Sequence, residues 1–284
     1  MRKICLGQFY FDIALLLRQT MFISTVLLNS ETWIGLTKTN IEELEKIDHI
    51  LLKRIFEAPA TTSTKSLYLE SGCLFLRIHI QARRLMFLYY LLNQKDDALI
   101  SKVFWAQKTS PTKNDWHSMV IEDLKEFGLD YLELNDIKTM KKDAFKKIVK
   151  ERCKESALKY LLENNEEKSK LKNLKYYQLN LQSYLTSTEI TTRQKKILFR
   201  FRTRMTNVGN NYGEKIKCPI CKLVNENDIQ EHLFKCLILK LKCPELYNIK
   251  DETYNDIFSL NYEKLIKIAR ICESVLRKRE ELLY

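Results

Sequence analysis

Four residues in the last quarter of the 284-residue chain have the types and the spacing of a metal site. Cys218 and Cys221 are separated by two residues, and His232 and Cys236 follow with three residues between them. Two thiolates at the first spacing can bind one ion across a tight turn, and residues four apart on a helix point the same way. Because four such ligands complete a tetrahedral shell and leave no position for water, the sequence predicts structural Zn²⁺.

Two alternatives to this ligand set stay open in the sequence. Cys243 is a spare thiol seven residues beyond Cys236 and could replace it. In the second alternative no metal binds, so that the thiols of the Cys-x-x-Cys pair are ordinary buried groups and the histidine lies at the surface. Asp228, with Glu231 three residues later, resembles a helix cap and predicts a helix that holds the second ligand pair.

The eight cysteines do not have the spacing of a secretory disulfide framework. Residues 1–17 lack a small-residue cleavage site after an apolar core, which argues against a signal peptide. A reducing, intracellular location, nuclear or cytoplasmic, is therefore expected. The most apolar segment, Ile13 to Leu28, is interrupted by Arg18-Gln19-Thr20 and is too short for a membrane span.

The chain is basic, with 48 Lys and Arg against 36 Asp and Glu and a formal net charge of +12. The excess is concentrated between Lys138 and Arg204, where about 19 basic residues face about 7 acidic ones. A charge of this size attracts a polyanion without specifying which one. RNA or DNA is the expected partner.

A predicted helix over Ile137 to Glu163 carries lysines at four-residue intervals opposite an expected apolar face of Ile137, Met140, Ala144, Ile148 and Cys153. These lysines form a basic ridge, of which four are candidate nucleic-acid ligands: Lys142, Lys146, Lys150 and Lys154. A solvated face, with Glu151 and Glu155 as ion-pair partners, is an equal alternative.

A second basic helix is predicted over Thr191 to Met205, with an apolar stripe of Ile197, Leu198, Phe201 and Met205. A separate stripe carries four cations and no acid: Arg193, Lys196, Arg200 and Arg204. Because like charges at this spacing destabilise a helix, we expect an anion to neutralise them, which favours a phosphate-facing helix over a solvated one.

The low content of six Gly and four Pro favours long helices, so the predicted fold class is mostly α. A buried helix is expected over Phe9 to Leu28, and a second begins at a capping pattern of Thr39 and Glu42 and ends by Pro59. Further helices are expected over the following ranges: Leu74–Leu92, Leu99–Gln107, Trp116–Phe127, Leu174–Leu185 and Tyr262–Leu283. Polar residues 164–170 are expected to form a turn. The predicted divisions are a helical bundle over 1–108, a basic connector over 109–205 and a zinc module with a C-terminal helix over 206–284.

In order along the chain, several short pieces resemble the C-terminal third of a non-LTR retrotransposon polyprotein, the part that follows the reverse-transcriptase palm. The resemblance covers most of the chain, and its most specific piece is the cysteine cluster. The pieces are Leu27–Trp33, Glu57–Pro59, Leu67–Cys73, Arg83–Leu88, Arg202–Met205 and Cys218–Cys236 with Gln230-Glu231-His232-Leu233.

This resemblance implies thumb-like helices from Phe9 to about Gln107, a connector to the template and a C-terminal CCHC zinc motif. The chain departs from the family in lacking an aromatic-x-Asp-Asp motif and a nuclease-type Pro-Asp after the cluster. Its one Asp pair, Asp96-Asp97, is interpreted as a helix N-terminus. The expected function is therefore a nucleic-acid-binding fragment without catalysis of its own, with a separate palm domain as a further expected partner. The alternatives are a host zinc-module protein that mediates protein contacts and a thumb subunit that works with a separately encoded palm.

Overall fold

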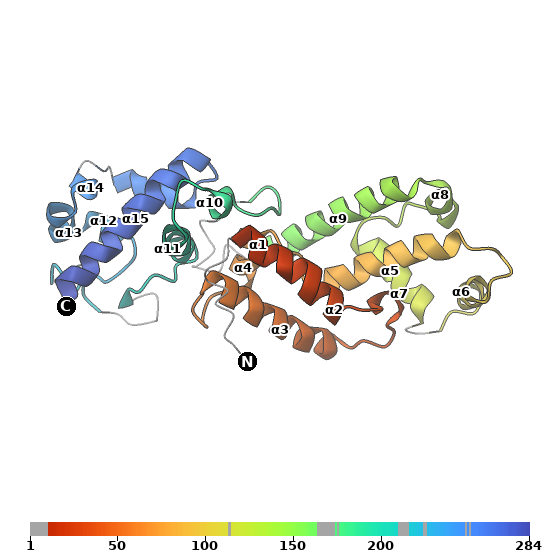
Figure 1. Cartoon of the computed structure of the whole chain (residues 1–284). Helices are drawn as coiled ribbons and strands as arrows, with labels where there is room; N and C mark the ends of the chain where they lie inside the picture. The colour runs from red at the N-terminus through yellow and green to blue at the C-terminus, as the bar shows by residue number, and fades with distance from the viewer. Residues whose placement is uncertain are drawn as a thin grey trace.

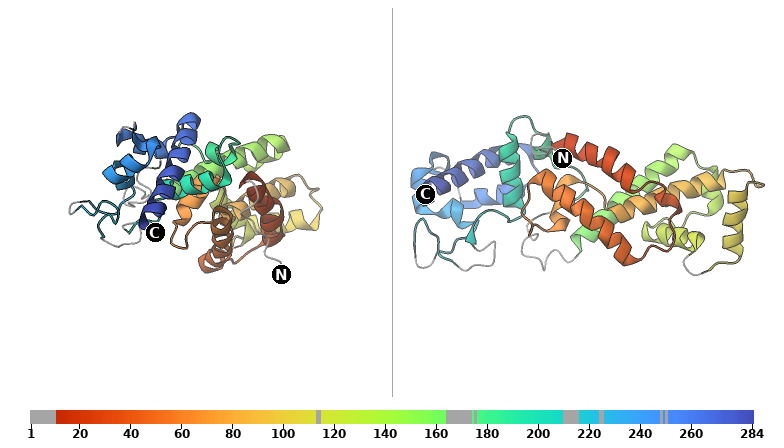
Figure 2. Two further views of the ribbon diagram at one scale, coloured as in Figure 1. Left: turned by 60° about the vertical axis from the view of Figure 1, so that its left-hand side comes forward. Right: turned by 60° about the horizontal axis from the view of Figure 1, so that its bottom comes forward.

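The computed structural model describes residues 11–112, 115–163, 174, 176–209, 216–223, 226–247, 249 and 251–284. Within these ranges it contains helices and no β-strand, apart from one isolated antiparallel bridge between Lys217 and Asn227. The predicted mostly α fold is confirmed. The helices form two groups along an elongated molecule, with α1 to α9 at one end and α10 to α15 at the other (Figures 1 and 2). No helix among the described residues is long and apolar enough to span a membrane.

The first group is built around α5, which contacts α3, α7, α8 and α9. Helices on both sides of the boundary predicted at residue 108 thus pack together. Its elements are α1 (Phe11–Leu17), the π-helix η2 (Arg18–Ile23), α2 (Ser24–Val26), the 3₁₀ turn η3 (Ser30–Thr32), α3 (Lys38–Phe56), α4 (Thr64–Ser71), α5 (Leu76–Leu92), α6 (Leu99–Thr109), α7 (Trp116–Glu126), α8 (Leu134–Thr139) and α9 (Lys142–Leu162).

The second group is built around the long helix α15, which packs on α11, α13 and α14. The predicted range for α15 is confirmed, and Asn261 caps it through a bond from the Lys264 amide. The elements of this group are α10 (Ser183–Thr186), α11 (Thr192–Arg202), α12 (His232–Lys235), α13 (Leu237–Lys242), α14 (Pro244–Tyr247), the 3₁₀ helix η5 (Asp251–Phe258) and α15 (Tyr262–Leu283).

The first helical run differs from its prediction in burial. Phe11, Ala14 and Ile23 are buried, but Leu16 and Met21 are 59% and 65% exposed. The run packs on neighbouring helices along one side only, although its sequence is apolar on all sides. A helix that is wholly buried was therefore the wrong expectation for this segment.

The N-cap residue of helix α3 lies two residues before the predicted one. Thr37 is the N-cap residue, and its hydroxyl accepts from the Asn40 amide while the Asn40 side chain accepts from the Thr37 amide. The capping box is therefore Thr37 with Asn40, not Thr39 with Glu42, because an Asn side chain closes the box as a Glu would. Glu57 ends the helix in a left-handed conformation.

The predicted helix over Ile137 to Glu163 is two helices, separated by the extended residues Met140 and Lys141. The buried face of α9 is Phe145, Val149, Cys153, Ala157 and Leu161. Ala144 is exposed and only Cys153 of the predicted set in α9 is buried, because the large Phe145 side chain rather than Ala144 sets the register of packing.

Two more predictions in the connector concern residues after α9. Residues 164–170, the expected turn, lie outside the described residues. The helix predicted over Leu174 to Leu185 is wrong, because only α10 is helical there. Tyr176 and Tyr184 in this segment are buried, and their hydroxyls donate to the Glu70 carboxylate of α4.

The two helix groups are joined through a buried ion pair. Arg202 of α11 donates from Nε to Glu70 Oε1 at 2.7 Å and from Nη1 to the Ile257 carbonyl at 2.6 Å. Both charged side chains are fully buried, so each needs the other. The neighbouring Gly72 has φ of +66°, and a Cβ there would lie 2.3 Å from the Asn180 backbone, so only glycine fits this contact.

Candidate metal centre

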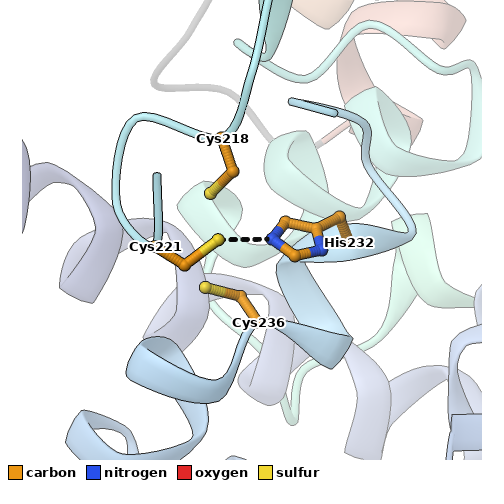
Figure 3. A group of neighbouring side chains, drawn as sticks. All are labelled: Cys218, Cys221, His232 and Cys236. Atoms are coloured by element: carbon orange, nitrogen blue, oxygen red, sulfur yellow. Dashed lines mark hydrogen bonds between the residues drawn. The ribbon is translucent and has the colours of Figure 1, made fainter. Parts of the chain in front are cut away.

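The four predicted ligands come together in the structure. The sulfur atoms of Cys218, Cys221 and Cys236 and a ring nitrogen of His232 all lie within 4.8 Å of one another (Figure 3). Tetrahedral zinc with Zn–S of 2.3 Å and Zn–N of about 2.0 Å places its ligand atoms roughly 3.6 to 3.8 Å apart. The Cys221 Sγ to His232 Nε2 distance of 3.4 Å is close to this separation. The quartet therefore fits one metal ion.

His232 turns its Nε2 atom toward the three sulfur atoms (Figure 3). Its other ring nitrogen, Nδ1, lies 2.8 Å from a carboxylate oxygen of Glu226. A carboxylate that accepts a hydrogen bond from the remote nitrogen of a ligating histidine orients the ring, and Glu226 is within reach of that role although its geometry does not complete the bond. Sequence reasoning did not find Glu226, although a carboxylate between the two predicted ligand pairs is a signal that could have drawn attention to it.

A short hairpin presents the first two thiols. The Cys218 amide donates to the Glu226 carbonyl at 2.9 Å, and the Lys222 amide donates to the Cys218 carbonyl at 3.0 Å. Lys222 has φ of +53°, which closes the turn after the Cys-x-x-Cys pair. The tight turn predicted for the Cys-x-x-Cys pair matches these bonds, and the strand pairing of the hairpin is a single bridge.

The predicted cap at Asp228 is wrong. Helix α12 begins at His232, its N-cap residue Glu231 makes no side-chain cap bond, and Cys236 follows the last residue of this single turn. The Asp228 carboxylate instead accepts from the Gly209 amide at 2.7 Å and from Arg279 of α15 at 2.9 Å. Asp228 is 1% exposed, so it anchors the hairpin to α15 rather than capping a helix.

Cys243 is not part of the quartet. Its thiol donates to the Glu245 carboxylate at 3.3 Å, and burial raises its pKa to about 11. The geometry therefore selects Cys236 between the two candidates. Burial likewise raises the pKa of Cys236 to about 12, so its thiolate requires a nearby positive charge, which a divalent ion would supply.

Helix α11 ends at Arg202, three residues before the predicted end, so Arg204 of the predicted stripe lies beyond the helix in a left-handed conformation. The four cations of the α11 stripe, Arg204 included, each meet a group from another element. Arg193 lies 3.4 Å from Glu273 of α15, and Arg204 lies 2.9 Å from Glu231 beside α12. Lys196 lies 2.6 Å from the Glu57 carboxylate at the end of α3, and Arg200 donates to the carbonyl of the same residue at 3.1 Å. The sequence analysis expected an anion to neutralise the stripe, and the protein itself supplies acceptor groups for these cations. Contact of the stripe with nucleic acid stays a prediction.

The basic ridge of α9 has a different environment. Lys142, Lys146 and Lys150 are exposed and form no ion pair or hydrogen bond within the part of the chain that the structure describes, while Lys154 donates to the Asn180 side chain at 3.0 Å. The solvated-face alternative invoked Glu151 and Glu155, which lie near Lys147 and Arg152 instead. Contact of the ridge with nucleic acid is not decided by this arrangement.

The remaining sequence motif with possible chemistry is the pair Asp96-Asp97. Both residues are exposed and lie in the turn before α6, whose N-cap residue is Ala98. The pair is therefore just outside the helix N-terminus that was predicted for it.

No family model, curated protein or solved structure matches the chain.

Proposed function

We propose that the chain is a non-catalytic nucleic-acid-binding fragment of a retrotransposon reverse-transcriptase protein, with a structural zinc ion in its CCHC cluster. The observation that carries the proposal is the row of three exposed lysines on α9 that meet no partner among the described residues, in a chain with a net charge of +12. Cations that no carboxylate neutralises attract phosphate and release its counterions on binding.

Zinc is the metal that the donor set supports best. Three thiols and one imidazole are soft to borderline ligands, which zinc accepts and which magnesium or calcium does not. Because the four ligands fill a tetrahedral shell, the ion would hold the hairpin, α12 and the start of α13 together and would not activate water. Elemental analysis of the purified protein should find one zinc per chain, and Cys221→Ser should reduce this content. Unchanged metal in the variant would disprove the ligand assignment.

Binding itself is tested by fluorescence anisotropy with labelled RNA and DNA oligonucleotides over a range of salt concentrations. The affinity should tolerate changes of sequence and should fall linearly with salt on a double logarithmic scale, since phosphate contacts carry little sequence information. A protein that binds no nucleic acid at low salt would refute the proposed function. Binding to heparin does not count as support, because any strongly basic protein can show it.

Catalysis by the chain alone is not part of the proposal. Polymerisation and metal-dependent cleavage need carboxylates that converge on divalent ions, and Asp96 and Asp97 lie in an exposed turn. Primer-extension and plasmid-nicking assays with magnesium or manganese should therefore be negative. Activity that is lost in a variant with both Asp96→Ala and Asp97→Ala would overturn this part.

A second candidate function is docking to another protein, either a host partner or a separate palm domain. The apolar exposed side of the first helical run favours it, since Leu16, Met21 and Leu28 are 59%, 65% and 67% exposed. Genomic sequence upstream of the Met1 codon separates the readings. An adjacent palm-encoding frame supports the retrotransposon proposal, whereas an isolated gene with introns supports the host protein.

A further inference from the structure

A groove of about 940 Å³ lies between α5 and α9, which run side by side in Figures 1 and 2. Tyr89 connects the two walls, because its hydroxyl donates to the Met140 carbonyl at 3.0 Å and its ring stacks on Phe145. The groove is thus a feature of two helices packed along their length.

One wall of the groove is the lysine column of α9, defined as Lys142, Lys146, Lys150 and Lys154. Consecutive members are four residues apart, which corresponds to about 6 Å along a helix axis. Arg83 adds a fifth cation, and Glu31 is the one carboxylate among the lining residues. The groove therefore presents an excess of positive charge to an elongated ligand.

The floor of the groove is apolar and aromatic, with Ala82, Met86 and Val149 among its members. Tyr90 is 51% exposed at its edge, and its ring stacks on Phe87 with centroids 5.7 Å apart and planes at 16°. An exposed aromatic face beside a row of cations is the combination with which proteins bind unpaired nucleotides, since cations follow the backbone and rings stack on bases.

Uncharged polar groups also line the groove, among them Gln19 of η2 and Asn93 and Gln94, which follow the end of α5. Duplex nucleic acid keeps its base faces stacked inside the helix and could use the lysines but not the floor. An acidic amphipathic protein helix could use the lysines and the apolar residues but has no polar group on its apolar side for these amide groups. Unpaired bases have an apolar face and polar edges, and so match all three surfaces.

We propose that single-stranded nucleic acid lies in the α5/α9 groove, with its phosphates along the lysine column and its bases over the apolar floor and Tyr90. This inference rests on the proposed function and adds the strand state of the ligand and its path. It separates the groove from the α11 stripe, whose cations are held by Glu57, Glu231 and Glu273.

The test uses the full chain and one labelled oligonucleotide as a single strand and as a duplex. The groove variant carries Lys142→Gln, Lys146→Gln and Lys150→Gln. Its slope of log affinity against log salt for the single strand should be smaller by about 2, since each phosphate contact contributes roughly 0.7. The matched control carries Lys141→Gln, Lys147→Gln and Lys159→Gln, which changes the net charge equally at residues that do not line the groove. The control should keep the slope of the original protein.

Stacking is tested at the ring rather than at the charges. Tyr90→Ala should weaken single-strand binding by between about 5-fold and about 150-fold, the range expected for one stacked base. Tyr90→Phe should retain the affinity, because it keeps the aromatic face. Tyr247→Ala, at a ring that is 72% exposed in the other helix group, is the control and should have no effect.

The outcomes distinguish this inference from the proposed function. Equal slope losses in the groove variant and its control, or tighter binding of the duplex with no effect of Tyr90→Ala, would overturn the groove assignment and leave nucleic-acid binding in place. Competition by an acidic amphipathic peptide together with no binding of the single strand would overturn the assignment in favour of a protein ligand. Failure of the original protein to bind any nucleic acid would remove the proposed function itself.

Discussion

Helix α9 carries the four lysines of the ridge, and α11 carries three cations of the stripe with the fourth, Arg204, just after its end, yet the two sets have opposite environments. On α11, each cation of the stripe meets a carboxylate or carbonyl from α3, α15 or the residue before α12. On α9, three of the four lysines meet no partner in the described residues and face a groove. The comparison teaches that helix-local charge does not reveal which cations are available to a ligand, because neutralising anions can come from distant segments.

Under the proposed function, this difference gives α11 a role in stability and α9 a role in binding. Helix α11 lies between the metal cluster and the first helix group, to which Arg202 ties it through Glu70. Helix α9 uses Phe145 and Val149 for packing and leaves its lysines to solvent. Changes around α11 should therefore reduce the free energy of unfolding, and changes to the α9 lysines should alter affinity alone.

The largest effect is expected from metal removal. A chelator should unfold the hairpin and α12 locally, because structural zinc contributes on the order of 10 kcal/mol to small zinc modules. Hydrogen exchange should rise over residues 216–247 and, through the lost Arg204 to Glu231 contact, at the end of α11. Amides of α5 and α9 should stay protected, because their contacts lie in the other helix group. Uniform loss of protection across both groups would show that the two groups unfold as one unit.

The next largest effect is expected from Arg202→Met. The substitution leaves the fully buried Glu70 carboxylate without its cation and should lower the free energy of unfolding by about 3 to 5 kcal/mol. Urea denaturation followed by circular dichroism measures this change. Combining it with Glu70→Gln should recover part of the loss. A matched Lys150→Met on α9 should change stability by less than about 0.5 kcal/mol.

The pH dependence of the free energy of unfolding should reveal the titration of the His79 imidazole on α5. Burial, with smaller effects of Arg18 and Arg83, lowers the pKa of His79 from 6.5 to about 4. The unfolded chain therefore binds a proton at His79 more tightly than the folded chain does. The contribution of the neutral imidazole to the free energy of unfolding is complete above about pH 6.5, and about 3 kcal/mol is lost as the pH falls toward 4. His79→Gln should remove this part of the slope. Asp123, whose pKa burial raises to about 6, acts in the opposite direction in both proteins and cancels in the comparison. Identical slopes in the original protein and the variant would contradict the assignment to His79.

The smallest effect is expected at the surface pairs of the stripe. A double-mutant cycle with Lys196→Ala and Glu57→Ala should give a coupling energy of at most about 1 kcal/mol, since the Glu57 side chain is half exposed. The same Lys196→Ala should leave the salt slope of oligonucleotide binding unchanged. A slope reduced by about 0.7, the contribution of one phosphate contact, would return the stripe to the binding surface.

The sequence pattern was sufficient to predict those features whose defining residues lie close together along the chain. The ligand quartet follows from two short spacings, because a Cys-x-x-Cys turn and an i, i+4 pair each place two donors on one side. Helices α5 and α15 follow from long periodic runs with clear ends at Asn93 and Asn261. The choice of Cys236 over Cys243 was open in the sequence, because both thiols lie at a distance from His232 that a turn could bridge.

Contacts between distant segments decided the rest. The partners of Arg193, Lys196 and Arg204 are at least 27 residues away along the chain, so no helix-local rule could supply them. The same holds for the carboxylate that Arg202 meets at Glu70 and for the anchoring of Asp228 to Arg279. The amino-acid sequence by itself determined the helical class and the four residues that come together as candidate metal ligands, because backbone periodicity and ligand spacing are local. Only the tertiary structure decided which cations are neutralised and which face the groove, because the Coulomb energy of a side chain depends on every charge that packing brings near it.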